Sequence, residues 1–150
     1  MVALHTGSTD ALSPLLLRDL RPLLECAFDG AFGDDDSHHT LGGVHVWVTG
    51  SAGLISHGSF IDRTLVCSGE TLRVGYVEAV ATEESYRRQG HGARVIRRTG
   101  QLIRARYPLA VLSTETHAFY KTLGWERCRG PTFVNGATAE HAPRRMTAMS

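Results

Sequence analysis

The stretch that decides the fold covers residues 72–103 and reads LRVGYVEAVATEESYRRQGHGARVIRRTGQLI. Its first part, residues 72–82, is largely apolar and is typical of a buried strand. Its last part has the period of an amphipathic helix. Apolar and small residues recur there on one helical face, at Ala93, Ile96, Gly100 and Ile103. Between strand and helix lies a turn punctuated by glycine, residues 87–92 (RRQGHG).

This turn has the composition of an anion site. Glycines let the backbone come close to a ligand, and the free amides at the start of the following helix point toward phosphate oxygens. The turn lacks the Gly-Lys-Ser/Thr of a P-loop and the three-glycine fingerprint of dinucleotide sites, which argues against both ligand classes. From the turn alone, an ordinary strand-to-helix connection is an equally good interpretation.

Upstream of this stretch, the sequence predicts one helix and an antiparallel meander. Residues 13–27 have apolar residues at helical spacing after the capping Ser13, and Pro22 should kink this helix or split it in two. Strand-like segments at 44–48 and 54–67 are joined to each other and to residues 72–82 by short turns, which favours antiparallel pairing.

Downstream, residues 109–113 (LAVLS) predict a short strand and residues 116–123 a short helix, with Gly124 as its C-terminal stop. A meander followed by strand, helix, strand and helix indicates a mixed sheet with helices on its faces.

The composition excludes several classes of function. Lys and Arg number 16 against 15 Asp and Glu, so the basic excess of a nucleic-acid-binding protein is missing. The three cysteines are far apart, which argues against disulfides and for a reducing compartment, and no metal-ligand spacing occurs. Without a recognisable signal peptide or membrane span, we expect a cytoplasmic domain over 1–150 that binds no metal, nucleic acid or membrane. The oligomeric state stays open, with a homodimer as one alternative.

A family resemblance adds to this interpretation. Arg87-x-x-Gly90-x-Gly92 after a strand resembles the R/Q-x-x-G-x-G/A signature of the GNAT superfamily of N-acetyltransferases, which hold the pyrophosphate of acetyl-CoA with this turn. Residues 13–134 are more specifically similar to the aminoglycoside 2'-N-acetyltransferases. The matching stretches are Ala27-Phe-Asp-Gly30, Thr40-Leu-Gly-Gly43, Gly75-Tyr-Val-Glu-Ala-Val-Ala81, Phe119-Tyr120, Leu123-Gly-Trp125 and Arg129-Gly-Pro-Thr132.

The resemblance implies a GNAT fold of the α/β (α+β) class, with a mixed, mostly antiparallel sheet and helices on both faces. It also implies acetyl-CoA as cosubstrate. In the family, the strand before the turn splays from its neighbour at a bulge, and pantetheine adds to the open edge. Carried over, this gives Val80, Ala81 and Thr82 as pantetheine contacts, with the Val80 amide as donor to the thioester oxygen. The pyrophosphate loop becomes Arg87, Arg88, Gln89, Gly90, His91 and Gly92.

Two side chains are candidates for proton transfer. Glu78 lies two residues before Val80, so we expect both side chains on the same face of the strand. The resemblance gives Glu78 the role of general base toward the substrate ammonium, and the alternative is a strand glutamate paired with a basic neighbour. Tyr120 matches the tyrosine that GNAT enzymes place near the sulfur as general acid, and the alternative is a packed helix aromatic.

The acceptor is expected to be a polycation, because aminoglycosides carry several ammonium groups. Asp36, in the acidic run 34–36, matches a retained family acid, although a solvated loop is the plainer interpretation of that run. The resemblance implies substrate contacts at Asp36, Glu78, Ala79 and Ser113.

The sequence departs from the family at three places, and at one of them Ser37 stands where a tryptophan is usual. Ala31 stands where an aspartate that contacts the antibiotic is usual, and the chain from about residue 135 onward (NGATAEHAPRRMTAMS) does not resemble the family. We therefore expect an atypical or truncated C-terminal part and a last strand that is missing or altered. A frameshift in the coding DNA is one hypothesis for this difference.

The implied activity is transfer of an acetyl group to the 2'-amino group of an aminoglycoside, which confers antibiotic resistance. The missing contacts favour a narrow range, with kasugamycin as an example of a smaller acceptor. Two alternatives remain: a GNAT enzyme that acetylates another amine, and a degenerate protein that only binds acetyl-CoA.

Overall fold

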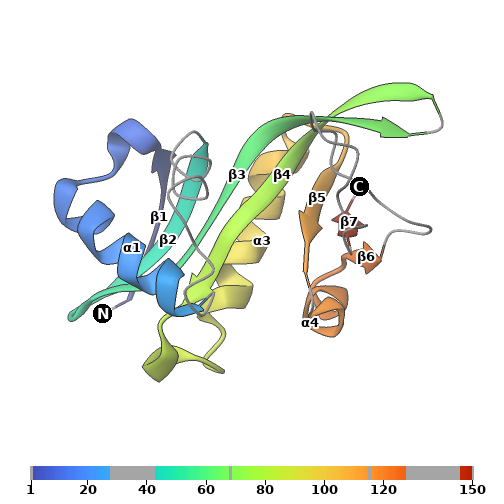
Figure 1. Cartoon of the computed structure of the whole chain (residues 1–150). Helices are drawn as coiled ribbons and strands as arrows, with labels where there is room; N and C mark the ends of the chain where they lie inside the picture. The colour runs from blue at the N-terminus through green and yellow to red at the C-terminus, as the bar shows by residue number, and fades with distance from the viewer. Residues whose placement is uncertain (1, 28–42, 68, 115, 128–145, 150) are drawn as a thin grey trace.

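The computed structural model describes residues 2–27, 43–67, 69–114, 116–127 and 146–149. In these ranges, a seven-stranded sheet has the order β1-β2-β3-β4-β5-β7-β6 (Figure 1). Its strands are β1 (Ala3–Ser8), β2 (Val44–Gly50), β3 (Gly53–Cys67), β4 (Glu70–Thr82), β5 (Ala110–Ser113), β6 (Glu126–Arg127) and β7 (Met146–Met149). The helices are α1 (Pro14–Ala27), α3 (His91–Arg104) and α4 (His117–Thr122), with 3-10 turns η1 (Thr9–Ala11) and η2 (Glu84–Tyr86).

The two longer helices cover opposite faces of the sheet. Leu20, Leu23 and Leu24 of α1 pack against Ala79 and Ala81 of β4, and we call this side the α1 face. Ile96 and Ile103 of α3 pack against Phe60 and Val77, which defines the α3 face. Only β4 and β5 pair in parallel, whereas the other neighbours are antiparallel. The predicted mixed, mostly antiparallel sheet with helices on both faces is confirmed.

Helix α1 begins at its predicted cap. The Leu16 amide donates a hydrogen bond to Ser13 Oγ at 3.1 Å. The helix continues through Pro22 to Ala27, so the expected split in two does not occur. Pro22 has no amide hydrogen to donate to the Arg18 carbonyl. Both residues are exposed, so water can donate to that carbonyl instead.

A bulge interrupts the pairing of β3 with β4. His57 pairs with Ala81, but Ser59 pairs with Glu78, so β4 has one residue more than β3 in this interval. Ala79 lies within it and has a φ of 55°, in the left-handed region. An extra residue of this kind bends a strand and shifts the alternation of its side chains.

Beyond the bulge, β4 also separates from β5. The parallel pairs run from Gly75 with Ala110 to Val77 with Leu112, and none follows. In the described ranges, no strand pairs with this edge of β4 after Val77, and Figure 1 shows β4 and β5 diverging. The bulge and the splayed strand that the family resemblance implied are therefore both present.

The last strand, which we expected to be missing or altered, is present. β7 lies between β5 and β6 and pairs antiparallel with both. Ladder hydrogen bonds are made by the main chain, so an unfamiliar sequence can still occupy the free edge of β5. Residues 128–145 lie outside the described ranges.

Two buried histidines connect β2 and β3 to the bulge. His45 Nδ1 lies 2.9 Å from His57 Nε2, and His57 Nδ1 lies 2.9 Å from the carbonyl oxygen of Ala79. Burial lowers the pKa of His45 to about 4 and that of His57 to about 3, so both rings are neutral at neutral pH. The carbonyl can only accept, so His57 carries its proton on Nδ1 and accepts from His45 at Nε2. His45 Nε2 in turn accepts from the Thr9 hydroxyl at 3.1 Å.

We predict that the free energy of unfolding falls when the pH is lowered from 7 to 5. The pKa of His57 rises to about 6.5 in the unfolded chain, so the unfolded state binds the extra proton and acid favours it. For His57 this loss is about 2 kcal/mol at pH 5. Urea denaturation of the wild type and of His57→Asn at both pH values measures it. Because asparagine does not titrate, the free energy of unfolding of the variant should fall by about 2 kcal/mol less than that of the wild type between pH 7 and pH 5. Equal losses in the two proteins would contradict a neutral buried His57.

Candidate active site

The turn between β4 and α3 forms the helix N-terminus that the sequence predicted. The first intrahelical hydrogen bond runs from the Arg94 amide to the Gly90 carbonyl at 3.0 Å, so the amides of residues 91–93 precede it. Gly90 has a φ of 85°, and a Cβ atom there would meet nothing within 4 Å. Glycine therefore suits this backbone conformation, and the open space beside Gly90 leaves room for a ligand to approach the turn.

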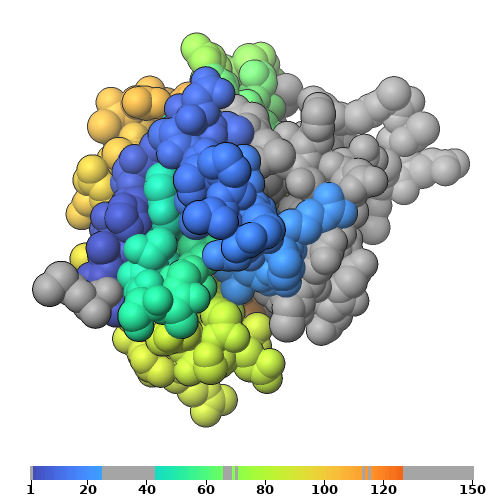
Figure 2. Space-filling model, turned by 90° about the vertical axis from the view of Figure 1, so that its left-hand side faces the viewer, coloured from blue at the N-terminus to red at the C-terminus, as the bar shows by residue number. Residues whose placement is uncertain are grey.

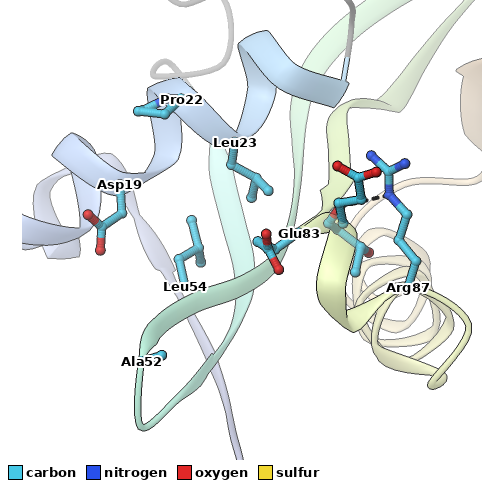
Figure 3. A pocket seen from close by; sticks show the side chains of 9 residues that line it. Asp19, Pro22, Leu23, Ala52, Leu54, Glu83 and Arg87 are labelled. Atoms are coloured by element: carbon cyan, nitrogen blue, oxygen red, sulfur yellow. Dashed lines mark hydrogen bonds between the residues drawn. The ribbon is translucent and has the colours of Figure 1, made fainter.

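Side-chain contacts hold this turn against the end of β4. Arg87 Nε donates to the Thr82 carbonyl at 3.2 Å, as Figure 3 shows. A Cβ atom on Gly92 would lie 3.1 Å from Thr82 Oγ1, so the start of α3 closely approaches the strand. Gln89 Nε2 donates to the Ser85 carbonyl at 3.4 Å, and the ring of His91 meets that of Tyr86 edge-on at 6.0 Å. The structure thus brings the predicted pyrophosphate loop, including exposed Arg88, next to Ala81 and Thr82.

Glu78 and Val80 lie on opposite faces of β4, which corrects the expectation of a shared face. Val80 packs against the cluster that contains Val77 and Ile96, on the α3 face. Glu78 follows Val77 directly, so its side chain, which is half-buried, points to the α1 face. The extra residue at Ala79 shifts the alternation by one position, and a simple count along the strand does not register this shift.

The structure brings together only some of the residues that we expected to contact the acceptor. Ala79 is buried on the α1 face beside Glu78, under Leu20 and Leu24. Ser113 ends β5, one residue after the last pair between β4 and β5, so its backbone borders the splay. Asp36 lies outside the described residues.

Tyr120 lies in the same apolar cluster against which Val80 packs. Its ring meets those of Phe119 and Trp125 edge-on, at 5.0 and 6.0 Å. Burial raises the pKa of Tyr120 to about 12, so the phenol keeps its proton at neutral pH. A buried, protonated phenol beside the splay has the protonation state that a general acid needs.

His117 was not singled out from the sequence. It lies three residues before Tyr120, which places both side chains on the same side of α4. Both of its ring nitrogens are buried, and no hydrogen-bond partner for them is found among the described residues. A buried donor or acceptor without a partner costs free energy, which makes this ring a candidate for contact with a bound molecule. In the sequence, the only feature that pointed to His117 was its position three residues before Tyr120.

A cavity of about 310 Å³ opens on the α1 face, between α1, the start of β3 and the segment after β4 (Figure 3). Three carboxylates line it, from Asp19, Glu83 and Glu84, together with one cation, Arg87. Figure 2 shows the three segments meeting on this side of the molecule, in blue, green and yellow-green. None of the three acids was assigned a role from the sequence. Because Thr82 and Arg87 line the cavity as well, this acidic region adjoins the predicted cofactor loop.

Neither a metal cluster nor a membrane span is found in the part of the chain that the structure describes. No three His, Cys, Asp or Glu side chains there gather as they would around a metal ion. No helix in those ranges is long and apolar enough to cross a bilayer.

Comparison with known proteins agrees with this geometry. The family described as "Acetyltransferase (GNAT) domain" matches residues 27–128. An aminoglycoside 2'-N-acetyltransferase of Mycolicibacterium fortuitum is 40% identical over 110 residues, which cover 72% of this chain and 56% of that protein. The chain therefore spans little more than half the length of this curated relative. It belongs to the GNAT family of acetyltransferases.

Solved structures show the same fold. Escherichia coli ElaA superposes with a TM-score of 0.73 at 17% identity, over 100% of both chains. An aminoglycoside 6'-N-acetyltransferase complexed with coenzyme A superposes with a TM-score of 0.70 at 15% identity, over 97% of this chain and 96% of that one. At these identities the likeness establishes the architecture alone.

We predict that Gly90→Val weakens acetyl-CoA binding by about tenfold or more, because a β-branched residue is strained at positive φ by about 1–3 kcal/mol and distorts the turn. Isothermal titration calorimetry measures the change. Gly69→Val is a matched control, since Gly69 has a φ of 80° and also meets nothing within 4 Å, but lies in the distant turn between β3 and β4. It should bind like the wild type. If both variants bind acetyl-CoA equally well, Gly90 does not belong to the site.

Proposed function

We propose that this chain folds as one acetyltransferase domain over residues 1–150 and transfers the acetyl group of acetyl-CoA to an amine of a cationic acceptor. The preferred acceptor is the 2'-amino group of an aminoglycoside, so the activity would confer resistance. One observation carries the proposal: the edge of β4 that is unpaired after Val77 leads directly to the amide end of α3. Such an edge can pair with pantetheine while the helix end takes the pyrophosphate.

Different residues of the chain bind the cofactor and stabilise the reacting thioester. The amides from His91 to Ala93 and the side chain of Arg87 hold the pyrophosphate, and Val80, Ala81 and Thr82 border the pantetheine. The Val80 amide donates to the thioester oxygen, where negative charge develops. The acceptor nitrogen attacks the carbonyl carbon, and the carbon–sulfur bond breaks.

Two proton transfers complete the reaction. Glu78 takes the proton of the acceptor ammonium, directly or through a water, and Tyr120 protonates the departing thiolate. Because Glu78 faces α1, the acceptor approaches from the α1 face, where Ala79 also lies. Val80 and Tyr120 share one cluster, which supports placing the thiol on the other side of the strand.

The acidic lining of the α1 face supports a cationic acceptor. Asp19, Glu83 and Glu84 face one cavity, and Glu78 projects from β4 to the same face. The curated relative from Mycolicibacterium fortuitum bears the name of a 2'-N-acetyltransferase of aminoglycosides, which supports that class. Asp36 and Ser113 are proposed as further acceptor contacts by resemblance.

Release of free CoA thiol, followed with a panel of amines, tests the proposal. The panel contains kasugamycin, gentamicin, tobramycin, a polyamine and a peptide with a free N-terminus. We expect turnover with aminoglycosides, and mass spectrometry with NMR should place the acetyl group on the 2' nitrogen. Turnover with the polyamine or peptide alone would identify another amine as the acceptor. Binding of acetyl-CoA without turnover of any amine would instead define a protein that only binds it.

We predict a narrow acceptor range. Deoxystreptamine drugs present several ammonium groups, and Ala31 replaces a family acid that contacts them. A charge-assisted hydrogen bond contributes roughly 1.5–3 kcal/mol, so the loss of one weakens binding by about one to two decades. Steady-state kinetics should show poorer Michaelis constants for gentamicin and tobramycin than for kasugamycin. Micromolar constants with fast turnover across the deoxystreptamine drugs would contradict this range.

Glu78→Gln should lower turnover by about 10²–10⁴-fold below pH 8, where the acceptor amine is charged and needs a base. The deficit should shrink at higher pH, because a free amine does not require one. The pH profile of kcat measures this effect. Asp10→Asn serves as the control, since Asp10 is an exposed carboxylate of η1 and does not line the cavity. A profile for Glu78→Gln that runs parallel to the wild type would exclude Glu78 as the base.

Tyr120→Phe should reduce kcat by about tenfold or more while leaving the Kd of acetyl-CoA nearly unchanged, because it removes the acidic proton and keeps the ring. Phe119→Leu is the control, since this exposed neighbour has no proton to donate. If Tyr120→Phe weakens binding and turnover equally, Tyr120 has a packing role.

A further inference from the structure

Side chains of β3 hold the bulge of β4 by its carbonyl groups. The carbonyls of Glu78, Ala79 and Ala81 each accept one hydrogen bond from a β3 side chain. These bonds come from Ser59 Oγ at 3.1 Å, His57 Nδ1 at 2.9 Å and Ser56 Oγ at 3.2 Å. All three donor residues are at most 1% exposed. At a bulge the main-chain hydrogen bonds of the ladder are interrupted. The side chains of β3 therefore hold this irregular segment of β4 at three of its carbonyl groups.

The bond from His57 determines the direction of the Ala79–Val80 peptide. No peptide bond of the described chain is cis, so the Ala79 carbonyl and the Val80 amide point in opposite directions. The carbonyl points toward His57 on β3. The Val80 amide therefore points away from the His57 ring, and it lies after Val77, on the part of β4 that β5 leaves unpaired.

The same bond strengthens the Val80 amide as a donor. A hydrogen bond to an amide oxygen polarises the peptide and makes its N–H a better donor, and successive bonds in a chain reinforce one another. Here the chain of hydrogen bonds runs from the Thr9 hydroxyl through His45 and His57 to the Ala79 carbonyl, and each group donates to the next one. It ends on an oxygen that has no proton to exchange, so it orients and polarises the peptide and does not deliver protons.

We propose that His57, held by His45, is a positioning residue for acyl transfer: it fixes and polarises the Ala79–Val80 peptide so that the Val80 amide can donate to the thioester oxygen. This inference rests on the proposed acetyl transfer. It assigns a role to two buried histidines, His45 and His57, that no step of the proposed reaction uses directly.

Three variants separate this role from a purely structural one. His57→Leu removes the donor to Ala79, whereas in His57→Asn the side-chain Nδ2 takes the place of His57 Nδ1 and keeps it. Val46→Ala creates a cavity on the α3 face, where Val46 packs with Ile55 and Val95 in a cluster that contains no residue of β4. Each variant is compared at a temperature where circular dichroism shows it folded.

We expect His57→Leu to lower kcat by about 10–100-fold, while the KM for acetyl-CoA stays within about twofold. His57→Asn should keep kcat within about threefold of the wild type, and Val46→Ala should keep it as well. A wild-type kcat in folded His57→Leu would overturn the proposal. Equal losses in His57→Leu and Val46→Ala would also overturn it, because they would mark a general effect of destabilisation.

A second measurement does not depend on turnover. In protein labelled with ¹⁵N-valine, the Val80 amide resonance reports directly on its peptide in the absence of any ligand. It should shift in His57→Leu and stay close to the wild type in His57→Asn. An unchanged Val80 resonance in His57→Leu would overturn the positioning role even if the enzyme is active. If instead the wild type neither binds acetyl-CoA nor acetylates any amine, the proposed function fails, while the resonance still tests whether His57 fixes this peptide.

Discussion

The structure of the site depends on one extra residue in β4. Between the pairs Ser59–Glu78 and His57–Ala81, β4 has two residues where β3 has one, and Ala79 takes a positive φ to accommodate this difference. That residue turns Val80 to the α3 face and leaves Glu78 on the α1 face. The Ala79 carbonyl that it exposes accepts a hydrogen bond from His57. Without this extra residue, β4 would continue as a regular strand, and Glu78 and Val80 would lie on the same face.

A left-handed alanine is unfavourable by about 1–2 kcal/mol, so the surrounding structure has to stabilise it. Three hydrogen bonds from β3 side chains do so, each with a net contribution of roughly 0.5–1.5 kcal/mol. Glycine would adopt the same backbone without strain. However, the Ala79 side chain is buried under Leu20 and Leu24, and a glycine would lose that contact. The position therefore combines a strained backbone with a packed methyl group, and the methyl group is part of the contact between α1 and β4.

The sequence predicted most of the elements but not the geometry of the bulge. Apolar patterns located α1, β2 to β5, α3 and α4, because each of these elements has buried apolar residues. β1 escaped notice because it lies on the sheet edge and needs few apolar residues; its His5 stacks on Trp47 at 5.4 Å. The contact between His45 and His57 depends on the register of β2 with β3, which no local pattern specifies. The expectation that Glu78 and Val80 share one face was wrong, because counting by two fails across an inserted residue.

The two faces of β4 also differ in polarity, and this difference agrees with the division of roles. On the α1 face, Asp19, Glu83 and Glu84 line a cavity that adjoins the end of the strand. On the α3 face, Val80 packs with Val77 and the buried ring of Tyr120. An ammonium group is stabilised near carboxylates, whereas a phenol keeps its proton where water is excluded. In the proposed reaction, the carboxylates of the α1 face attract the cationic acceptor. The buried phenol of Tyr120 keeps its proton on the other side of the strand, and the bulge keeps the two surroundings apart.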